Sequence, residues 1–304
     1  MMKEMIRKVM EWCKLWNGET ATAKQADPSS DKREKEQAAD NREVQDRLEN
    51  YLWKHYEFRF NVLTEQPEYC AKGQGTDTPY KIVTQRTLNT LCLEAHRHRI
   101  NCWDKDVSRL LHSRKVENYH PFLHYMSHLP QWDGVDRVTP LAVRISRKPM
   151  WVKGFHRWML GVAAQWLGQA QDCANAVAPM LVSREQGKRK SSFCKILMPK
   201  ELTPYYIDKF DLTSESGCEQ KLSLFGLINM DEFDKYRAGQ MPALKNLMQM
   251  TTLTFRRAHR PAFSHLPRIA SFIGTSACSY RCRMYSSGSV RKIGYRASFA
   301  RGMS

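Results

Sequence analysis

The sequence predicts an α/β protein in which a mostly helical N-terminal region precedes a core with a mostly parallel sheet. Three short apolar runs that end in polar residues predict the sheet: 178–182, 224–230 and 268–276. Runs of this length and content are typical of strands that are buried on both faces, as in parallel sheets. Ligands of such sheets bind at the carboxyl ends of the strands, so the polar residues there are the candidates for a site.

Three regions follow one another along the chain. Residues 1–50 are expected to form an N-terminal helix, over 2–16, and a charged linker or solvated helix without aromatic residues, over 17–47. Residues 51–150 are expected to form a helical domain, and residues 151–304 the domain that carries the parallel sheet.

Helical spacing of apolar residues marks three further segments. We expect helices over 87–97 and 104–114, and a strongly apolar core helix over 151–169. Between the last two, Asp133-Gly134 predicts a tight turn, and Trp132 is expected to anchor this turn on an apolar surface.

Length, composition and charge set limits on function. The chain has 304 residues, of which 42% are hydrophobic and 26% charged, as is ordinary for a globular protein with a sizeable core. It has no apolar run near the roughly 20 residues that span a bilayer, and its charged N-terminus differs from a signal peptide. We therefore expect a cytoplasmic protein without a membrane partner.

The formal net charge is +17 at neutral pH. Such an excess favours a polyanionic partner, because Lys and Arg displace condensed counterions from phosphate backbones. The alternative is a basic surface without a partner of this kind. Part of the excess is local, since the segment after Ala277 carries six basic residues and no acidic one.

Nine cysteines are scattered without a repeated CxxC spacing, which argues against a disulfide framework and a zinc ribbon. Cys92, His96, His98 and Cys102 form a metal-like group. On a helix, however, Cys92 and His96 share a face while His98 and Cys102 lie on another, so the spacing argues against a zinc site.

The run 178–182 opens into a polar loop that ends in Lys190-Ser191, at the start of a helix expected over 191–197. A strand, a short loop and Lys-Ser at a helix start are how a P-loop wraps the phosphates of a nucleotide. Lys190 would reach the β- and γ-phosphates, and Ser191 would offer its hydroxyl to Mg²⁺. The pattern is incomplete, because Ser183 and Arg189 stand where a P-loop usually has glycine.

A P-loop requires a second strand that ends in acids, and the run 224–230 ends in Asp231-Glu232, 41 residues after Lys190. We expect Asp231 to hold Mg²⁺ through a bound water and Glu232 to orient the attacking water. The third run ends in Thr275-Ser276, whose hydroxyls are expected near the γ-phosphate or the attacking water.

The segment 242–262 is basic and includes Lys245, Arg256 and Arg257. One interpretation is a loop or hairpin that contacts nucleic-acid phosphates. The other is a solvated basic surface.

Taken together, these segments resemble the virulence-associated protein E family, which is similar to superfamily 3 helicases and to the primase-helicases of phages and mobile elements. The resemblance runs from about Tyr51 to Ser276 and is carried by FLHYMSHLPQWDGVDRV, FHRWMLGVAAQ, MLVSREQGKRKSSFCKILMP, LFGLINMDEFD and LPRIASFIGTS.

The resemblance implies a P-loop, AAA+-like ATPase core that binds ATP and Mg²⁺ and acts on DNA, single-stranded or forked, as a homo-oligomeric ring. Asp231 and Glu232 match the family's catalytic acids, and Lys245 and Arg256 fall in its basic motif between strands. With Arg257, they are the expected nucleic-acid-binding residues. Ser191 and Asp231 are the expected magnesium ligands. The expected nucleotide-binding residues are Gln186, Gly187, Lys188, Lys190, Ser191, Ser192 and Thr275.

Two departures from the family concern the end of the chain. Ala277 stands where the family has an asparagine that senses the γ-phosphate, and the segment that follows lacks the family's Gly-Ser-Arg-Arg-Phe motif, whose arginine acts on a neighbouring subunit. We therefore expect a core that is incomplete at its C-terminus, a tail that is degenerate or out of frame, and weak turnover, since such an arginine is worth about a thousandfold in rate.

Three functions remain open from the sequence. The first is a DNA-dependent, helicase-like ATP hydrolase of a mobile element or prophage. The second is a catalytically impaired DNA-binding remnant of that family. The third, ranked lower because no substrate lid is evident, is a P-loop phosphotransferase.

Overall fold

The computed structural model describes residues 28–73, 79–170, 173–183, 185, 187–257, 262–277 and 294–296, with the side chains of all but 28–40 and 294–296. The helix expected over 2–16 and most of the tail after Ala277 lie outside the described residues. By its contacts the chain divides into two units: unit 1 comprises 1–58 and 69–115, and unit 2 comprises 59–68 and 116–304. The sequence had placed its boundaries after residues 50 and 150.

Unit 1 is built on three helices, α2 (Pro28–His55), α3 (Gln85–Arg97) and α4 (Asp104–Leu111). From Pro28 on, the segment expected as a linker or solvated helix is therefore helical. Thr84 caps α3, because its side chain accepts a hydrogen bond from the Thr87 amide. The apolar core of these helices consists of Leu48, Leu52, Leu88, Leu91, Ala95, Val107 and Leu111.

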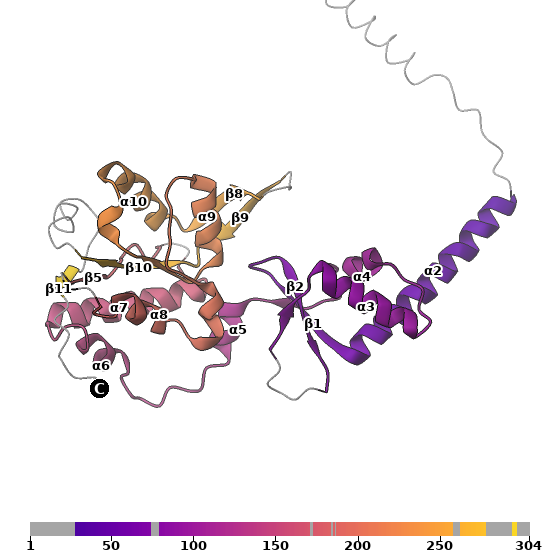
Figure 1. The fold of residues 1–304 in the computed structure, drawn as a ribbon, viewed down its shortest axis with the longest axis horizontal. Helices are drawn as coiled ribbons and strands as arrows, with labels where there is room; N and C mark the ends of the chain where they lie inside the picture. The colour runs from indigo at the N-terminus through magenta and orange to yellow at the C-terminus, as the bar shows by residue number, and fades with distance from the viewer. Residues whose placement is uncertain are drawn as a thin grey trace, which may run out of the picture. The chain divides into compact units, whose positions relative to one another are not determined.

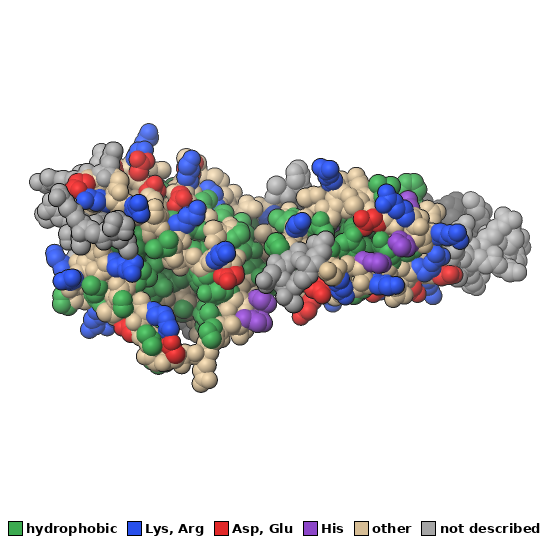
Figure 2. All heavy atoms as spheres, turned by 60° about the horizontal axis from the view of Figure 1, so that its bottom comes forward, with side chains coloured by type: hydrophobic (Ala, Val, Ile, Leu, Met, Phe, Trp, Pro, Cys, Tyr) green, Lys and Arg blue, Asp and Glu red, His purple; other side chains and the backbone are tan. Residues whose placement is uncertain are grey.

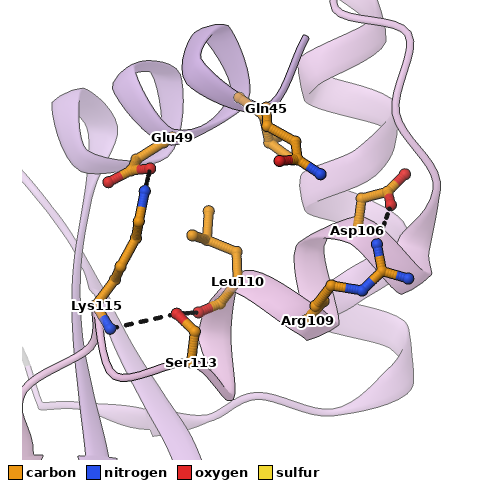
Figure 3. Close-up of a pocket in the computed structure, with 8 residues that line it drawn as sticks. Gln45, Glu49, Asp106, Arg109, Leu110, Ser113 and Lys115 are labelled. Carbon is orange, nitrogen blue, oxygen red and sulfur yellow. Dashed lines mark hydrogen bonds and ion pairs between the residues drawn. The ribbon is translucent and has the colours of Figure 1, made fainter. Parts of the chain in front are cut away.

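A small pocket of about 180 Å³ lies between α2 and α4 (Figure 3). Its charged groups neutralise one another in pairs: Lys115 binds Glu49, and Arg109 lies 3.1 Å from Asp106. The charged side chains that line the pocket are thus paired, and the Lys115–Glu49 pair connects the chain after α4 to α2.

Strands also occur in the region that the sequence predicted as helical. They form a four-stranded sheet of order β3-β2-β1-β4. Its members are β1 (Tyr56–Asn61), β2 (Gln66–Ala71), β3 (Lys81–Ile82) and β4 (Asn118–Tyr119). Within unit 2, β4 pairs in parallel with the end of β1, Phe60 opposite Asn118. Strands β3 and β4 have only two residues each, and β1 and β2 do not alternate strictly between buried and exposed residues, so these strands lack the period-2 pattern that marks a strand in sequence.

Unit 2 contains a five-stranded sheet of order β11-β5-β10-β7-β6, in which every pairing is parallel. The strands are β5 (Met180–Val182), β6 (Tyr206–Ile207), β7 (Leu227–Met230), β10 (Ser271–Ser276) and β11 (Gly294–Arg296). The parallel sheet that the sequence predicts is thus present. The last of the three predicted strands, β10, lies between the other two, with Thr275 opposite Leu181 and Gly274 opposite Met230.

Helices cover both faces of this sheet (Figure 1). On one face, α7 (Pro149–Trp166) and α8 (Lys190–Ile196) pack with the side chains of Leu181, Leu227 and Ile273. On the other, α9 (Glu215–Leu224) and α10 (Met241–Gln249) pack with those of Met180, Ile228 and Phe272. Successive strand residues alternate between the two clusters, as the pleat of a strand requires. Helix α7 is the core helix that the sequence predicts over 151–169.

Shorter elements complete unit 2. They are α5 (Pro121–Ser127), α6 (Val138–Val143), the 3₁₀ turns η1 (Lys200–Tyr205), η2 (Phe233–Lys235) and η3 (Ala238–Gln240), and the antiparallel hairpin of β8 (Thr252–Arg256) and β9 (Phe263–Pro267). The described part of the basic segment 242–262 therefore consists of helix α10 and strand β8. No helix among the described residues is long and apolar enough to cross a bilayer.

Strand β10 starts three residues later than the predicted run, because the backbone amides of residues 268–270 donate to the carbonyls of Thr251 and Leu222, outside the sheet. Arg268 also binds this region through its side chain. Its guanidinium is buried and donates to the carbonyls of Ala270 and Asn175, both at 2.8 Å, and to that of Met248 near the end of α10. Burial lowers the pKa of Arg268 to about 10, so the group stays charged at neutral pH. It satisfies carbonyls at the helix end that have no partner within the helix.

The turn at Asp133-Gly134 is present, but the expected role of Trp132 is wrong. Gly134 has a φ of +81°, and Asp133 accepts the Val135 amide at 3.1 Å and forms an ion pair with Arg137. Hydrogen bonds from Arg137 lower the pKa of Asp133 to about 2. Trp132 remains 76% exposed, because local polar contacts form the turn without an apolar anchor.

Candidate functional site

A pocket of about 370 Å³ lies at the carboxyl ends of β5, β10 and β7. It is lined by nearly every residue that the sequence analysis predicts to bind nucleotide or magnesium. Of those, the residues lining it are Gly187, Lys188, Lys190, Ser191, Ser192, Asp231, Glu232 and Thr275. Gln186, the other nominated residue of the loop, lies outside the described residues.

Strand order explains why these residues meet. Because β10 lies between β5 and β7, the end of β10 separates the loop after β5 from the acids after β7. Ser183, the first residue after β5, donates its amide to the Ser276 carbonyl at 3.2 Å. Thr275 is thereby placed between Lys190-Ser191 and Asp231 rather than at the edge of the site.

Lys190 begins α8 and extends its ammonium group between two strand ends. The Nζ atom donates to the carbonyl oxygens of Ser183, at 3.0 Å, and Ser276, at 2.9 Å. Neither acceptor carries a formal charge. The ammonium group is therefore held at the mouth of the pocket without a carboxylate partner among the hydrogen bonds it makes there.

Two hydroxyl groups converge on a single oxygen of Asp231. Ser191 Oγ donates to Asp231 Oδ1 at 2.9 Å, and Thr275 Oγ1 donates to the same oxygen. The amide of Glu232 in turn donates to Thr275 Oγ1 at 3.3 Å. Asp231 is thus oriented by one group from the loop helix and by another from the neighbouring strand.

Glu232 has a left-handed backbone, with a φ of 50°, and its mostly exposed carboxylate binds Lys235. The next acid, Asp234, was not nominated from the sequence. Its Oδ1 accepts Ser276 Oγ at 3.1 Å and the Ala277 amide at 3.3 Å, and so ties η2 to the end of β10. The sequence offered one signal for Asp234: it is the third acid in Asp231-Glu232-Phe233-Asp234, directly after an apolar strand.

The loop before Lys190 contains two residues with a left-handed backbone, Gly187 at a φ of +75° and Arg189 at +49°. Turns of this kind can align successive amide groups into a concavity that binds anions. Lys188 is paired with Glu185 at 2.7 Å. Arg189 occupies the position where the sequence pattern lacks its glycine, and it adopts the conformation that glycine would adopt there.

A second pocket, of about 380 Å³, shares Asp231 and Glu232 with the first and extends toward Asp208 and Tyr236. Asp208 accepts hydrogen bonds from Tyr206 Oη at 2.5 Å and from Asn229 Nδ2 at 3.2 Å. Both acidic and basic side chains line this second pocket, since Lys209 and Lys235 lie there beside the carboxylates. Burial, reinforced by the charges of Asp231 and Asp208, raises the pKa of the Cys194 thiol in α8.

The three basic residues expected to bind nucleic acid lie outside these pockets. Lys245 is half-buried on α10, and Arg256 is exposed at the end of β8. The side chain of Arg257 is only 13% exposed and lies 3.3 Å from the Glu65 carboxylate. Arg256 is therefore better placed than Arg257 to meet a polyanion.

The donor set fits a nucleotide with its magnesium. Cationic side chains, Lys188 and Lys190, lie on the loop side of the pocket, and the carboxylates of Asp231 and Glu232 lie at the end of β7. Cationic side chains bind phosphate oxygens. Mg²⁺ prefers oxygen ligands, which the carboxylates and the hydroxyl of Ser191 offer.

Solved structures and a family model are similar to this chain. The chain is similar to the apo C-terminal region of NrS-1, with 12% identity, 76% of this chain and 56% of that chain covered, and a TM-score of 0.45. The A form of the same apo region shows 12% identity, with 76% of this chain and 56% of that chain covered, and a TM-score of 0.42. This chain therefore spans little more than half of that region. No curated protein matches.

A family model, the virulence-associated protein E-like domain, matches residues 126–279, which is more than half of the 304 residues. The match includes the loop before Lys190, the acids after β7 and the end of β10. By this match, the chain belongs to the virulence-associated protein E-like family.

Proposed function

We propose that this chain binds ATP with Mg²⁺ in the pocket at the ends of β5, β10 and β7, and hydrolyses it as a DNA-associated, helicase-like ATPase with an AAA+-like core. The observation that carries the proposal is the convergence of Ser191 and Thr275 on Asp231, in the pocket that also holds Lys190. A purely structural strand end would not require a lysine without a carboxylate partner and an oriented carboxylate in the same pocket.

Each side chain has a role in this scheme. Lys190 binds phosphate oxygens in exchange for the Ser183 and Ser276 carbonyls that its ammonium group now contacts. Ser191 and Asp231 hold the magnesium ion, which when bound neutralises charge on the β- and γ-phosphates. Thr275 keeps Asp231 in place. Glu232 orients a water molecule and accepts its proton, for which its carboxylate must leave Lys235.

We propose DNA as the polyanion for two reasons. The chain has a net charge of +17, and strand β8 of the hairpin ends at the basic residue Arg256. On the face drawn in Figure 2, Lys and Arg side chains are spread over the surface rather than gathered in one patch. We further propose that the chain assembles into a homo-oligomeric ring.

One observation favours a second function, that of a DNA-binding remnant with impaired turnover. At Ala277 the chain presents only a backbone amide, which Asp234 accepts, where the resemblance implied an asparagine side chain facing the γ-phosphate. Without that side chain, ATP would bind without efficient hydrolysis.

The test measures binding of a fluorescent ATP analogue and ATP hydrolysis, each with and without single-stranded DNA. We expect Lys190→Ala to lower nucleotide affinity at least tenfold and to abolish DNA-stimulated hydrolysis, because the ammonium group is a main electrostatic contact to the phosphates. Lys195→Ala is the matched control, since it removes the same charge from an exposed position on the same helix. It should change both quantities less than twofold.

The outcomes separate the two functions. Nucleotide binding with DNA-stimulated hydrolysis supports the ATPase, and nucleotide and DNA binding without hydrolysis supports the remnant. Equal affinities for wild type and Lys190→Ala, with both proteins folded by circular dichroism, would contradict a nucleotide site in this pocket.

A further inference from the structure

Three side chains of unit 1 that carry metal-binding atoms come together at the end of α3. Cys92, His96 and Cys102 each offer one such atom, and these atoms all lie within 4.8 Å of one another. Among the described residues this is the one group of three or more His, Cys, Asp or Glu found in such an arrangement. It lies outside the segment 126–279 matched by the family model, and nothing in the proposed ATPase activity uses it.

Helix geometry accounts for two of the three. Cys92 and His96 are four residues apart on α3, so their side chains lie on the same face. The thiol of Cys92 lies 3.8 Å from His96 Nε2. This part of the sequence-based interpretation is confirmed.

Cys102 reaches the same face because the helix stops before it. Helix α3 ends at Arg97, and Arg99 adopts a left-handed backbone with a φ of +60°. The amide of Ile100 then donates to the Ala95 carbonyl at 3.1 Å, which turns the chain back along the helix. The expectation that Cys102 lies on another face is therefore wrong, because it assumed a continuous helix.

The contacts around Cys102 are close. Its carbonyl oxygen lies 2.7 Å from His96 Nε2 and 3.1 Å from Cys92 Sγ. Cys92 and Cys102 are buried, with exposed fractions of 9% and 1%, whereas His96 is exposed. The group is thus closed toward the core of the unit and open to solvent on the side of the imidazole. His98 lies apart and packs on Tyr51, with ring centroids 4.8 Å apart.

We infer that Cys92, His96 and Cys102 bind one zinc ion, with solvent in the fourth position. Two thiolates and an imidazole nitrogen are ligands that select zinc over magnesium or calcium, and three protein ligands leave one tetrahedral position open. The ion would tie the end of α3 to the chain that leads into α4.

Binding requires a definite movement of protons. Burial, together with the neighbouring Cys92 thiol, raises the pKa of Cys102 to about 12. Zinc displaces both thiol protons to solvent, and the imidazole carries its proton on Nδ1 so that the lone pair of Nε2 faces the ion. The hydrogen bond from Nε2 to the Cys102 carbonyl is given up in the process.

Cobalt(II) titration of the full chain, under reducing conditions, tests the site, because thiolate-to-cobalt absorption reports the ligands directly. We expect the absorption of two coordinated thiolates in a tetrahedral site, reversed by one equivalent of zinc. Cys92→Ser, Cys102→Ser and His96→Gln should each lower cobalt affinity at least tenfold. Cys70→Ser and Cys173→Ser are the controls, since these two cysteines lie outside the group, and they should leave the spectrum unchanged.

A second measurement does not depend on whether the buried variants fold. Zinc should slow alkylation of Cys92 and Cys102 in the wild-type chain, as read by mass spectrometry of peptides, while Cys173 keeps its rate. Absence of thiolate-to-cobalt absorption, its survival in Cys102→Ser, or alkylation of both cysteines at rates that zinc does not change would overturn the site. A Cys92–Cys102 disulfide in the chain purified with reductant would overturn it as well.

Discussion

Arg189 holds a backbone conformation that favours glycine, directly before the lysine of the proposed phosphate site. Its φ and ψ are +49° and +31°, and its side chain is exposed. This conformation costs a residue with a Cβ about 1–2 kcal/mol, whereas it costs glycine almost nothing. At Arg189, the glycine that the sequence pattern lacks therefore corresponds to a local energetic cost.

This cost can be measured by replacing Arg189 with glycine. We expect Arg189→Gly to raise the free energy of unfolding by about 0.5–1 kcal/mol, because the relief of strain exceeds the greater entropy of glycine in the unfolded chain. Urea denaturation of wild type and variant gives the value. Arg189→Ala, which removes the same charge but keeps a Cβ, should give no such gain; equal stabilisation by both would show that charge, not strain, is the cause.

Among the elements, the start of β7 depends on close contact with α5 and α7. Gly226 precedes this strand, and its carbonyl accepts Trp166 Nε1 at 3.1 Å. A Cβ built on Gly226 would lie 2.3 Å from the ring of Phe122 and 2.9 Å from Trp166 Nε1. Because Gly226 has no side chain, the rings of Phe122 and Trp166 can pack directly against its backbone.

We therefore expect Gly226→Ala to lower the free energy of unfolding by about 1–3 kcal/mol, because Phe122 and Trp166 must shift to admit one methyl group. Thermal unfolding followed by circular dichroism checks this. Gly239→Ala is the matched control, since a Cβ there meets no atom within 4 Å. Similar losses for both variants would contradict the packing argument.

At the scale of the whole molecule, the net charge of +17 predicts that binding to DNA depends strongly on salt. We expect affinity for single-stranded DNA to fall linearly with salt on logarithmic axes. Arg256→Ala should reduce this slope by about one, because it removes one phosphate contact. Fluorescence anisotropy over a salt series gives the slope.

Arg157→Ala provides the comparison, because it removes an equal charge from an exposed position on α7, away from the hairpin. It should leave the slope close to that of wild type. If both substitutions change it equally, the contact with DNA is not at the hairpin. Arg257 is a poor choice for this test, because its ion pair with Glu65 contributes to the fold of unit 2.

Local patterns predicted the main parts of the candidate site. An apolar run followed by Lys190-Ser191, and another followed by Asp231-Glu232, were enough to identify two strand ends and their polar residues. This worked because strand burial and the residues that follow a strand are adjacent in the chain. The same reasoning missed the strands of residues 56–82, because β1 and β2 do not alternate strictly between buried and exposed residues and β3 has only two residues.

Contacts between segments far apart in sequence could not be predicted in this way. The insertion of β10 between β5 and β7, the ion pair of Arg257 with Glu65, and the return of Cys102 to the face of α3 all depend on how the chain pairs and turns. Asp234 belongs with them, because only its contact with Ser276 distinguishes it from other surface acids.

The sequence by itself thus determined the class of fold and the residues Lys190, Ser191, Asp231, Glu232 and Thr275 as candidates, since each follows from its immediate neighbours. Only the tertiary structure decided that Ser191 and Thr275 meet at one oxygen of Asp231, and that Cys92, His96 and Cys102 meet at all. The reason is physical: burial periodicity is encoded locally, whereas strand order and the exact end of a helix emerge from packing across the whole unit.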